Sequence, residues 1–185
     1  MIARPSNDEI AFYLNKWNND NKLIEKDSCL YKLFLTTYPN NKDLDDILAK
    51  SSTLNSLYST NIFSIYDVAK HIHSLKIDDR LKKNDLTLVK DIAQNTINKK
   101  NKNFYSFATK YCNHHKPDNF PIYDKYVEKV LMYFKKDKFT KFKKADLKDY
   151  EKFYTILLEY KKFYNITYGL KDLDKYLWLL GKENF

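Results

Sequence analysis

Glycine and proline are scarce in this sequence, which has 2 Gly and 4 Pro among its 185 residues. Antiparallel sheets need tight turns and bulges that depend on these two residues, whereas helices lose nothing without them. Long apolar runs are also missing: Ile156–Leu158 is typical of those present, and the first five residues hold no apolar signal core. We therefore expect helices, no membrane segment and a cytoplasmic protein.

Cysteine is equally rare. Cys29 and Cys112 show neither a C-x-x-C spacing nor a histidine partner at the spacing of a zinc site. Both fall on segments with a helical pattern, so we expect them to be reduced and buried. The sequence predicts no metal site and no cofactor.

What the sequence does contain is a regular apolar pattern. Hydrophobic residues make up 43% of the chain and aromatic residues 16%, so the chain has enough apolar surface to fold. Apolar side chains recur at helical spacing from end to end, and the cleanest stripe is Phe104, Phe107, Ala108, Tyr111 and Cys112. No linker or internal repeat interrupts the pattern. We predict an all-α, compact orthogonal domain of about nine helices over residues 1–185.

Several single residues refine this prediction. Ser6 and Asp124 stand where a helix N-cap is expected, and Gly181 stands where the last helix should end. Trp17 and Trp178 lie on apolar faces at opposite ends of the chain, and we expect both to be core residues.

Positive charge is concentrated in the second half of the chain. Residues 98–148 hold 14 Lys and no Arg against five acids, which accounts for the whole net charge of +9. A field of one sign attracts polyanions, with an affinity that falls as salt rises. Nucleic acid is therefore the expected partner, DNA before RNA. A lysine-rich solvated surface without a partner is the alternative that the charge leaves open.

Residues 104–124 form the most unusual segment. The pattern predicts a helix, a loop bounded by Pro117 and Pro121, and an acid at the start of the next helix. This segment resembles the helix, loop and Pro-x-Asp segment of helix-hairpin-helix DNA glycosylases of the 8-oxoguanine type. The resemblance places Asp124 at a helix N-terminus facing a flipped nucleotide. Residues 54–72 are similar to that family's early helix pair, and Asn61 matches the position of a side chain that wedges into the duplex.

The sequence also departs from this family. The family's hairpin is a glycine-rich turn, but the corresponding stretch Asn98–Asn103 contains no glycine. Bifunctional members carry a Schiff-base lysine just after the hairpin, where this chain has Phe104–Ser106. Lys102 and Lys110 flank that gap and are the candidate amines. Without such a lysine, the resemblance implies a route in which the Asp124 carboxylate positions water and stabilises the positive charge on the sugar as the base departs.

Other residues are candidates for contact with nucleic acid. Lysine side chains can bind phosphates, adjacent histidines can bind phosphate or donate to a leaving base, and tyrosine rings can stack on bases. Each type has a structural alternative: Asp124 can act as an ordinary helix cap, the histidines can bind free carbonyls at a helix end, and the tyrosines can belong to the core. The candidates are Lys99, Lys100, Lys125, His114, His115, Tyr105 and Tyr123.

Three functions remain open at this point. The first is a DNA-glycosylase-like protein, an N-glycosylase if it is an enzyme, which flips a nucleotide against Asp124 and cleaves its glycosidic bond. This function requires Asp124, Asn61 and the basic segment to share one concave surface. The second is a nucleic-acid-binding module without chemistry. The third is a helical adaptor whose lysines meet an acidic protein. We assume a monomer, since the sequence does not indicate an oligomeric state.

Overall fold

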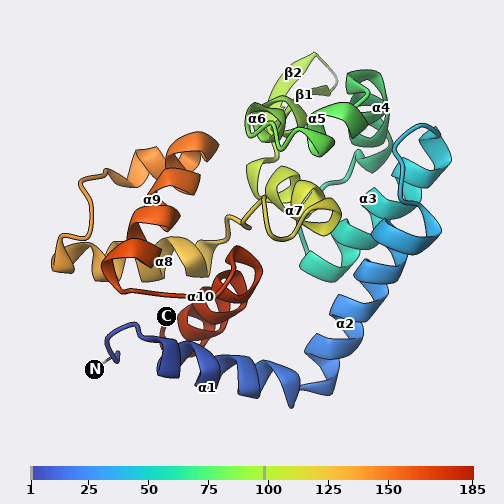
Figure 1. Cartoon of the computed structure of the whole chain (residues 1–185). Coiled ribbons are helices and arrows are strands. Elements are labelled where there is room, and N and C mark those ends of the chain that lie inside the picture. Colours follow the sequence, from blue (N-terminus) through green and yellow to red (C-terminus); the bar gives the residue numbers. More distant parts are fainter. Residues whose placement is uncertain (1, 98) are drawn as a thin grey trace. The chain divides into compact units, whose positions relative to one another are not determined.

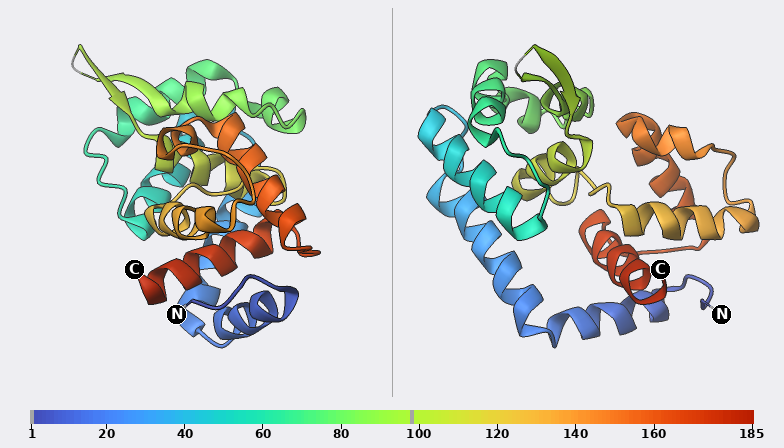
Figure 2. Two further views of the ribbon diagram at one scale, coloured as in Figure 1. Left: turned by 90° about the vertical axis from the view of Figure 1, so that its left-hand side faces the viewer. Right: turned by 180° about the vertical axis from the view of Figure 1, so that it is seen from behind.

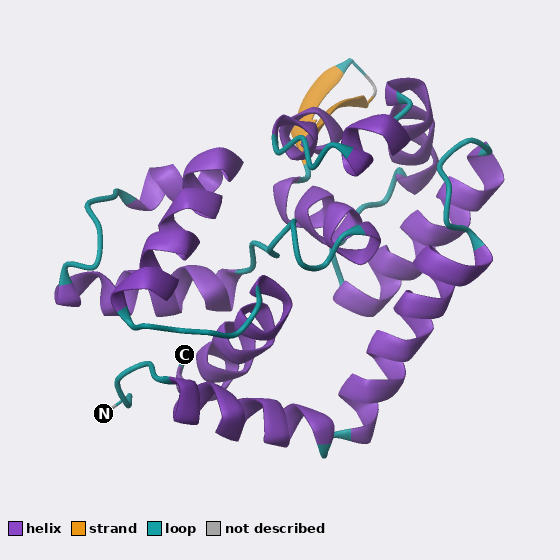
Figure 3. Cartoon of the chain, viewed as in Figure 1, coloured by secondary structure: helices purple, strands orange, loops and turns teal. Residues whose placement is uncertain are grey.

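The computed structural model of the chain describes residues 2–97 and 99–185, and these form ten α-helices and one two-stranded hairpin (Figure 3). The all-α class that the sequence predicts is confirmed. Met1 and Asn98 lie outside the described residues, so the first residue of the predicted hairpin stretch is not described. By their internal contacts the residues group into two compact units, Met1–Ile24 with Pro121–Phe185 (unit 1) and Glu25–Phe120 (unit 2). The prediction of a single domain over residues 1–185 stays a prediction.

Unit 2 is built from the middle of the chain. The helix α2 (Asn21–Tyr31) leads into it and continues as a short π-helix, η1 (Lys32–Thr37), so the winding changes near the end of this helical segment. The following elements are α3 (Leu44–Tyr58), α4 (Ile65–Leu75), α5 (Asp78–Lys82), α6 (Thr87–Ala93), β1 (Gln94–Ile97), β2 (Lys100–Asn103) and α7 (Tyr105–His115).

The core of unit 2 forms where α3 packs on α4 and α6 packs on α7. The predicted stripe of α7 is confirmed at four of its five positions, since Phe107, Ala108, Tyr111 and Cys112 are all buried. Burial of a large apolar side chain such as Phe107 stabilises the fold by about 1.5–3 kcal/mol. The fifth, Phe104, is half-buried because it precedes the helix and joins it to the hairpin.

Unit 1 is built from both ends of the chain. Its elements are α1 (Asn7–Asn18), α8 (Lys125–Phe134), the 3₁₀ turns η2 (Lys135–Asp137) and η3 (Lys144–Lys148), α9 (Tyr150–Phe163) and α10 (Leu170–Asn184). The helix α10 packs against both α1 and α8 (Figure 1). The basic stretch 135–144 consists of the 3₁₀ turn η2, irregular chain and the first residue of η3.

Two of the predicted helix ends are correct and one is wrong. The Ser6 hydroxyl accepts a hydrogen bond from the Glu9 amide at 3.1 Å, and the Asp124 carboxylate accepts one from the Tyr126 amide at 2.9 Å. Gly181 does not end the last helix, because α10 continues to Asn184. A Cβ atom on Gly181 would lie 2.7 Å from Tyr126 Cβ, so the missing side chain lets α10 approach α8.

Two predictions of burial also need correction. Cys112 is buried as expected, but Cys29 is exposed, because it lies on a face of α2 that the core does not cover. Trp17 and Trp178 are half-buried and contact each other edge to face, instead of lying inside the core. None of the helices within residues 2–97 and 99–185 is long and apolar enough to cross a membrane.

Candidate nucleic-acid interface

The predicted hairpin stretch is a β-hairpin that joins α6 to α7. The strands β1 and β2 pair antiparallel from Gln94 opposite Asn103 to Ile97 opposite Lys100, and the Phe104 amide closes the base by donating to the Ala93 carbonyl at 2.8 Å. Buried side chains alternate along β1, whereas all four residues of β2 are exposed. Backbone pairing therefore holds the hairpin's shape in a sequence without glycine.

The hairpin presents three ammonium groups to solvent, since Lys99, Lys100 and Lys102 are all exposed. Lys99 adopts a φ of 60°, in the left-handed region, at the turn between the strands. A row of lysines on a backbone-paired projection suits contact with phosphates, and such contacts position a nucleic acid without reading its sequence.

The loop between α3 and α4 is held rigidly by Asn55. The Asn55 Oδ1 atom accepts hydrogen bonds from the Thr60 hydroxyl at 2.6 Å and the Ile62 amide at 3.0 Å, while Asn55 Nδ2 donates to the Ile62 carbonyl at 3.0 Å. The Ile62 side chain is buried. This clamp fixes the two residues on either side of Ile62, which are Asn61 and Phe63.

Both of these flanking residues face solvent. Asn61 is exposed and adopts a φ of 57°, and Phe63 is 100% exposed. A fully exposed aromatic ring on a loop fixed in this way is available for contact with a partner. This position could not be identified from the sequence, because Phe63 follows Ile62 in an apolar pattern that is typical of core residues.

The left view of Figure 2 shows the hairpin and the loop between α3 and α4 on the same side of unit 2. That side therefore carries the segment of Lys99, Lys100 and Lys102 and the loop that contains Asn61 and Phe63. Positive charge with an adjacent exposed aromatic ring is the usual make-up of a surface that binds nucleic acid.

Lys110 lies elsewhere in unit 2, inside a cluster of polar side chains. It is 3% exposed, and its Nζ atom donates to the Ser106 hydroxyl at 2.5 Å. The Tyr58 ring centroid lies 5.2 Å from Lys110 Nζ and 3.5 Å from Lys26 Nζ, and the Tyr58 hydroxyl lies 3.0 Å from His114 Nε2. Lys110 therefore lies in a buried environment made of a hydroxyl acceptor and an aromatic ring.

His115 belongs to a different, buried network. Its Nε2 atom lies 3.2 Å from Asn41 Oδ1, which also accepts hydrogen bonds from the Tyr111 hydroxyl at 2.6 Å and from Lys50 at 2.7 Å. Burial, with the charge of Lys50 as the next cause, lowers the pKa of His115 well below its usual value. This burial weighs against contact between His115 and a partner, which stays a prediction.

Lys50 is the centre of that network, and the sequence did not indicate it. The side chain is completely buried, and its Nζ atom also donates to the carbonyls of Tyr38 at 3.0 Å and Asn40 at 2.7 Å. Burial lowers the pKa of Lys50 to about 8, against the opposing effect of the Asp78 and Asp46 carboxylates. Three fixed acceptors around one ammonium group indicate a structural role for this lysine.

Asp124 in unit 1 is a half-buried helix cap, and its neighbours differ sharply in exposure. Lys125 is exposed, but the Tyr123 ring is buried edge to face against Phe153 at 5.7 Å. The Tyr123 hydroxyl donates to Glu128 and accepts from Lys148. Base stacking on Tyr123 would need a ring face that the core already uses, whereas the half-buried Tyr105 at the start of α7 keeps part of its ring accessible.

The Glu128 carboxylate, four residues after Asp124 in the chain, is paired with two lysines. It lies 3.0 Å from Lys144 Nζ and 3.3 Å from Lys148 Nζ. Burial raises the pKa of Glu128, but the hydrogen bonds from Tyr123 and Lys144 outweigh this effect and hold the pKa below its usual value. Burial and the neighbouring Glu128 together raise the pKa of the Tyr123 hydroxyl.

The predicted catalytic residues and the predicted wedge residue Asn61 are divided between the two units. Asp124 belongs to unit 1, and Lys110, Lys102 and Asn61 belong to unit 2. The prediction that they share one concave surface stays a prediction.

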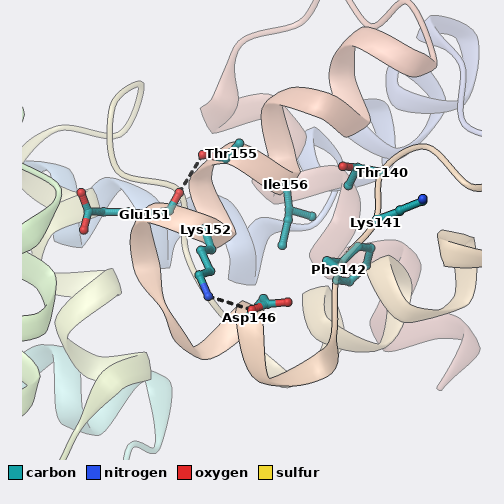
Figure 4. A pocket seen from close by; sticks show the side chains of 8 residues that line it. All are labelled: Thr140, Lys141, Phe142, Asp146, Glu151, Lys152, Thr155 and Ile156. Carbon is teal, nitrogen blue, oxygen red and sulfur yellow. Dashed lines mark hydrogen bonds and ion pairs between the residues drawn. The ribbon is translucent and has the colours of Figure 1, made fainter.

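Unit 1 also contains an open pocket of about 470 Å³ between the chain at residues 140–142, η3 and α9 (Figure 4). An ion pair between Lys152 and Asp146 at 2.9 Å lies on its wall, and the Thr155 hydroxyl is bound to the Glu151 carbonyl at 2.9 Å. The pocket contains none of the candidate site residues, and four of its eight lining residues bind one another in the pairs Lys152–Asp146 and Thr155–Glu151.

Comparison with known proteins places the chain in a family. Residues 9–119 match the profile of the N-terminal domain family HI_0787_N, which spans all but the last residue of unit 2. A protein of Haemophilus influenzae, named only as an uncharacterized protein, is 54% identical over 144 residues, which cover 77% of this chain and 69% of that relative. The chain therefore belongs to the HI_0787_N family. No solved structure gives a significant match.

Proposed function

We propose that this protein binds DNA through the side of unit 2 that carries the hairpin and the loop between α3 and α4, and that it acts as a DNA-glycosylase-like enzyme. The observation that carries the proposal is the combination of three exposed hairpin lysines with Asn61 and Phe63 on that side. The lysines supply affinity for phosphates, and the loop supplies groups that can enter a base stack.

The proposed chemistry uses Asp124 of unit 1. Its carboxylate orients a water molecule toward the sugar carbon of a flipped nucleotide and stabilises the positive charge that develops there. The bond between the sugar carbon and the base nitrogen breaks, and its electron pair leaves with the base. The water oxygen forms the new bond to carbon, and the proton that it loses passes through the Asp124 carboxylate to the departing base nitrogen. The resemblance to helix-hairpin-helix glycosylases supports this role.

Lys110 is a better candidate for the alternative nucleophile than Lys102. Lys102 is exposed to solvent on β2. Lys110 is 3% exposed and lies beside the Ser106 hydroxyl, and a desolvated site is one in which a lysine can act as a nucleophile. An amine attack on the sugar carbon would leave an imine that borohydride reduces to a stable adduct.

A second candidate function is DNA binding without base release. The cap that Asp124 provides to α8 supports it, because a carboxylate engaged by the Tyr126 amide has one oxygen fewer for water. On this view the same surface of unit 2 binds DNA and Asp124 only stabilises a helix.

The deciding experiment is a base-release assay on duplexes that carry individual lesions or mismatches, with wild type, Asp124→Asn and Lys110→Gln compared at equal DNA occupancy. Asp124→Asn keeps the size and part of the capping ability of the side chain. Release that is lost in Asp124→Asn establishes the glycosylase, and a borohydride adduct that is lost in Lys110→Gln establishes the amine route. Binding of every duplex without any release would leave the binding function alone.

A further inference from the structure

A row of three aromatic rings crosses unit 1 and ends beside Asp124. Trp17 of α1 contacts Trp178 of α10 edge to face with centroids 5.8 Å apart, and Trp178 contacts Tyr126 of α8 in the same manner at 6.4 Å. The Tyr126 amide is the group that binds the Asp124 carboxylate. The row therefore runs from α1 across α10 to the start of α8.

The rings are only half-buried, so each keeps part of its surface in solvent. Gly181 fixes the spacing at one end, because a Cβ atom there would collide with Tyr126. Edge-to-face packing between neighbours holds the rings in place without covering all of their faces.

A lysine accompanies each ring of the row. Lys175 Nζ lies 4.9 Å from the Trp17 centroid, Lys182 Nζ lies 4.8 Å from the Trp178 centroid, and Lys125 Nζ lies 4.8 Å from the Tyr126 centroid. The nearby carboxylate of Glu183 is paired with Lys16 at 2.9 Å, so it offsets little of this charge.

We propose that this aromatic row, Trp17, Trp178 and Tyr126 with its three lysines, is a binding site for a single-stranded segment of DNA. The inference rests on the proposed function, since it extends the DNA contacts into unit 1. Alternating rings and ammonium groups fit a strand, because bases stack on the rings while phosphates draw the flexible lysines away from them. Unpaired bases are required, because a duplex keeps its base faces covered.

The position of the row gives it a consequence for the proposed reaction. Lys125 and Tyr126 directly follow Asp124 in the chain, so a strand held on the row passes the carboxylate proposed to act on it. Because Lys125, Tyr126 and Trp178 all lie outside residues 9–119, this site also lies largely beyond the region that the family profile matches.

The test uses the intrinsic fluorescence of the protein. Its two tryptophans are both members of the row, so their emission reports on this site without a label. The probe is an oligodeoxythymidine of about twelve nucleotides, within the length that such strand-binding sites cover. We expect saturable quenching whose midpoint matches the binding curve measured independently by the anisotropy of a labelled oligomer.

Variants separate the row from the rest of the protein. Lys125→Gln with Lys182→Gln should weaken binding of the oligomer about tenfold, while the matched pair Lys138→Gln with Lys162→Gln should leave it unchanged. Trp178→Phe keeps an aromatic ring for packing and should remove most of the quenching, and circular dichroism checks that each variant is folded.

The outcomes of these measurements test the aromatic row and the proposed function separately. Binding of the oligomer without a change in tryptophan emission, and with equal affinity in both lysine pairs, would overturn the row as a binding site and leave the proposed function standing. Absence of binding to any single strand or duplex at low salt would overturn the proposed function itself, and the row with it.

Discussion

The lysines of the two units differ in their exposure to solvent. Unit 2 buries Lys50 and Lys110, whereas every described lysine of unit 1 is exposed or half-buried. Burying an ammonium group is costly unless fixed acceptors surround it, so a buried lysine implies either a structural network or a chemical role. An exposed lysine carries no such desolvation cost and can bind a negatively charged partner. Exposure therefore separates lysines that hold the fold from those available to bind phosphate.

The two buried lysines of unit 2 also differ from each other. Lys50 donates to two backbone carbonyls and to Asn41 Oδ1, all fixed by the loop between η1 and α3. Lys110 donates to the rotatable hydroxyl of Ser106, beside the Tyr58 ring. We infer a structural role for Lys50 and propose the chemical role for Lys110.

The largest expected effect comes from removing the charge of Lys50. Lys50→Met leaves two carbonyls and one amide oxygen without their buried donor, and we expect the free energy of unfolding to fall by about 3 kcal/mol. Urea denaturation followed by circular dichroism measures it. Lys70→Met, at an exposed position of α4, should change stability by less than about 0.5 kcal/mol. Similar values for the two variants would remove the distinction between buried and exposed lysines.

The second prediction concerns the exposed lysines of unit 2. Replacing Lys99, Lys100 and Lys102 together with glutamine should weaken binding to duplex DNA about twentyfold and reduce the salt dependence by about two to three phosphate contacts. Fluorescence anisotropy over a range of salt measures both quantities. The matched control replaces Lys76, Lys83 and Lys90, which are exposed in the same unit. Equal loss in both triple variants would mean that total charge, not the hairpin, determines binding.

The third prediction uses the pKa of Lys50. The folded protein releases this proton near pH 8 and the unfolded chain near its usual pKa of 10.5, so the unfolded chain binds more protons between these values. The contribution of Lys50 to stability therefore rises with pH across this window. From about pH 8 to about pH 9.5, wild type should gain about 1.5 kcal/mol relative to Lys50→Met. A difference that stays constant with pH would contradict the lowered pKa.

The smallest expected effect belongs to Phe63. Because the ring is fully exposed, Phe63→Ala should leave the free energy of unfolding unchanged while weakening binding to duplex DNA about fivefold through lost stacking. Tyr31→Ala is the matched control, since Tyr31 is an exposed aromatic residue of α2 in the same unit. A loss of stability without a loss of affinity would show that Phe63 serves the fold and not the interface.

Most of the helical fold could be predicted from the sequence because local signals carry it. Helical apolar spacing located the core stripe of α7, and Ser6 and Asp124 marked helix starts through their own capping bonds. The hairpin was not predicted as strands, because the exposed Asn and Lys residues of β2 show no alternation of apolar side chains. Gly181 was misread because its role depends on Tyr126, a residue far away in the sequence.

Less of the candidate site than of the fold could be predicted from the sequence. In the sequence, Lys50 cannot be distinguished from the other lysines. Only the fold places it against Asn41 and two carbonyls. Trp17 and Trp178 lie at opposite ends of the chain, and only the packing of α1 on α10 brings them together. Such constellations depend on long-range contacts, which a pattern of neighbouring residues does not report.

The most direct test of the proposed function is the salt dependence of binding to duplex DNA by the wild-type chain. We expect measurable binding at about 50 mM salt that weakens at least tenfold by about 200 mM, because lysine contacts to phosphate release bound counterions. Absence of binding at the lower salt concentration, or an affinity that does not change with salt, would contradict a DNA-binding role for the hairpin lysines.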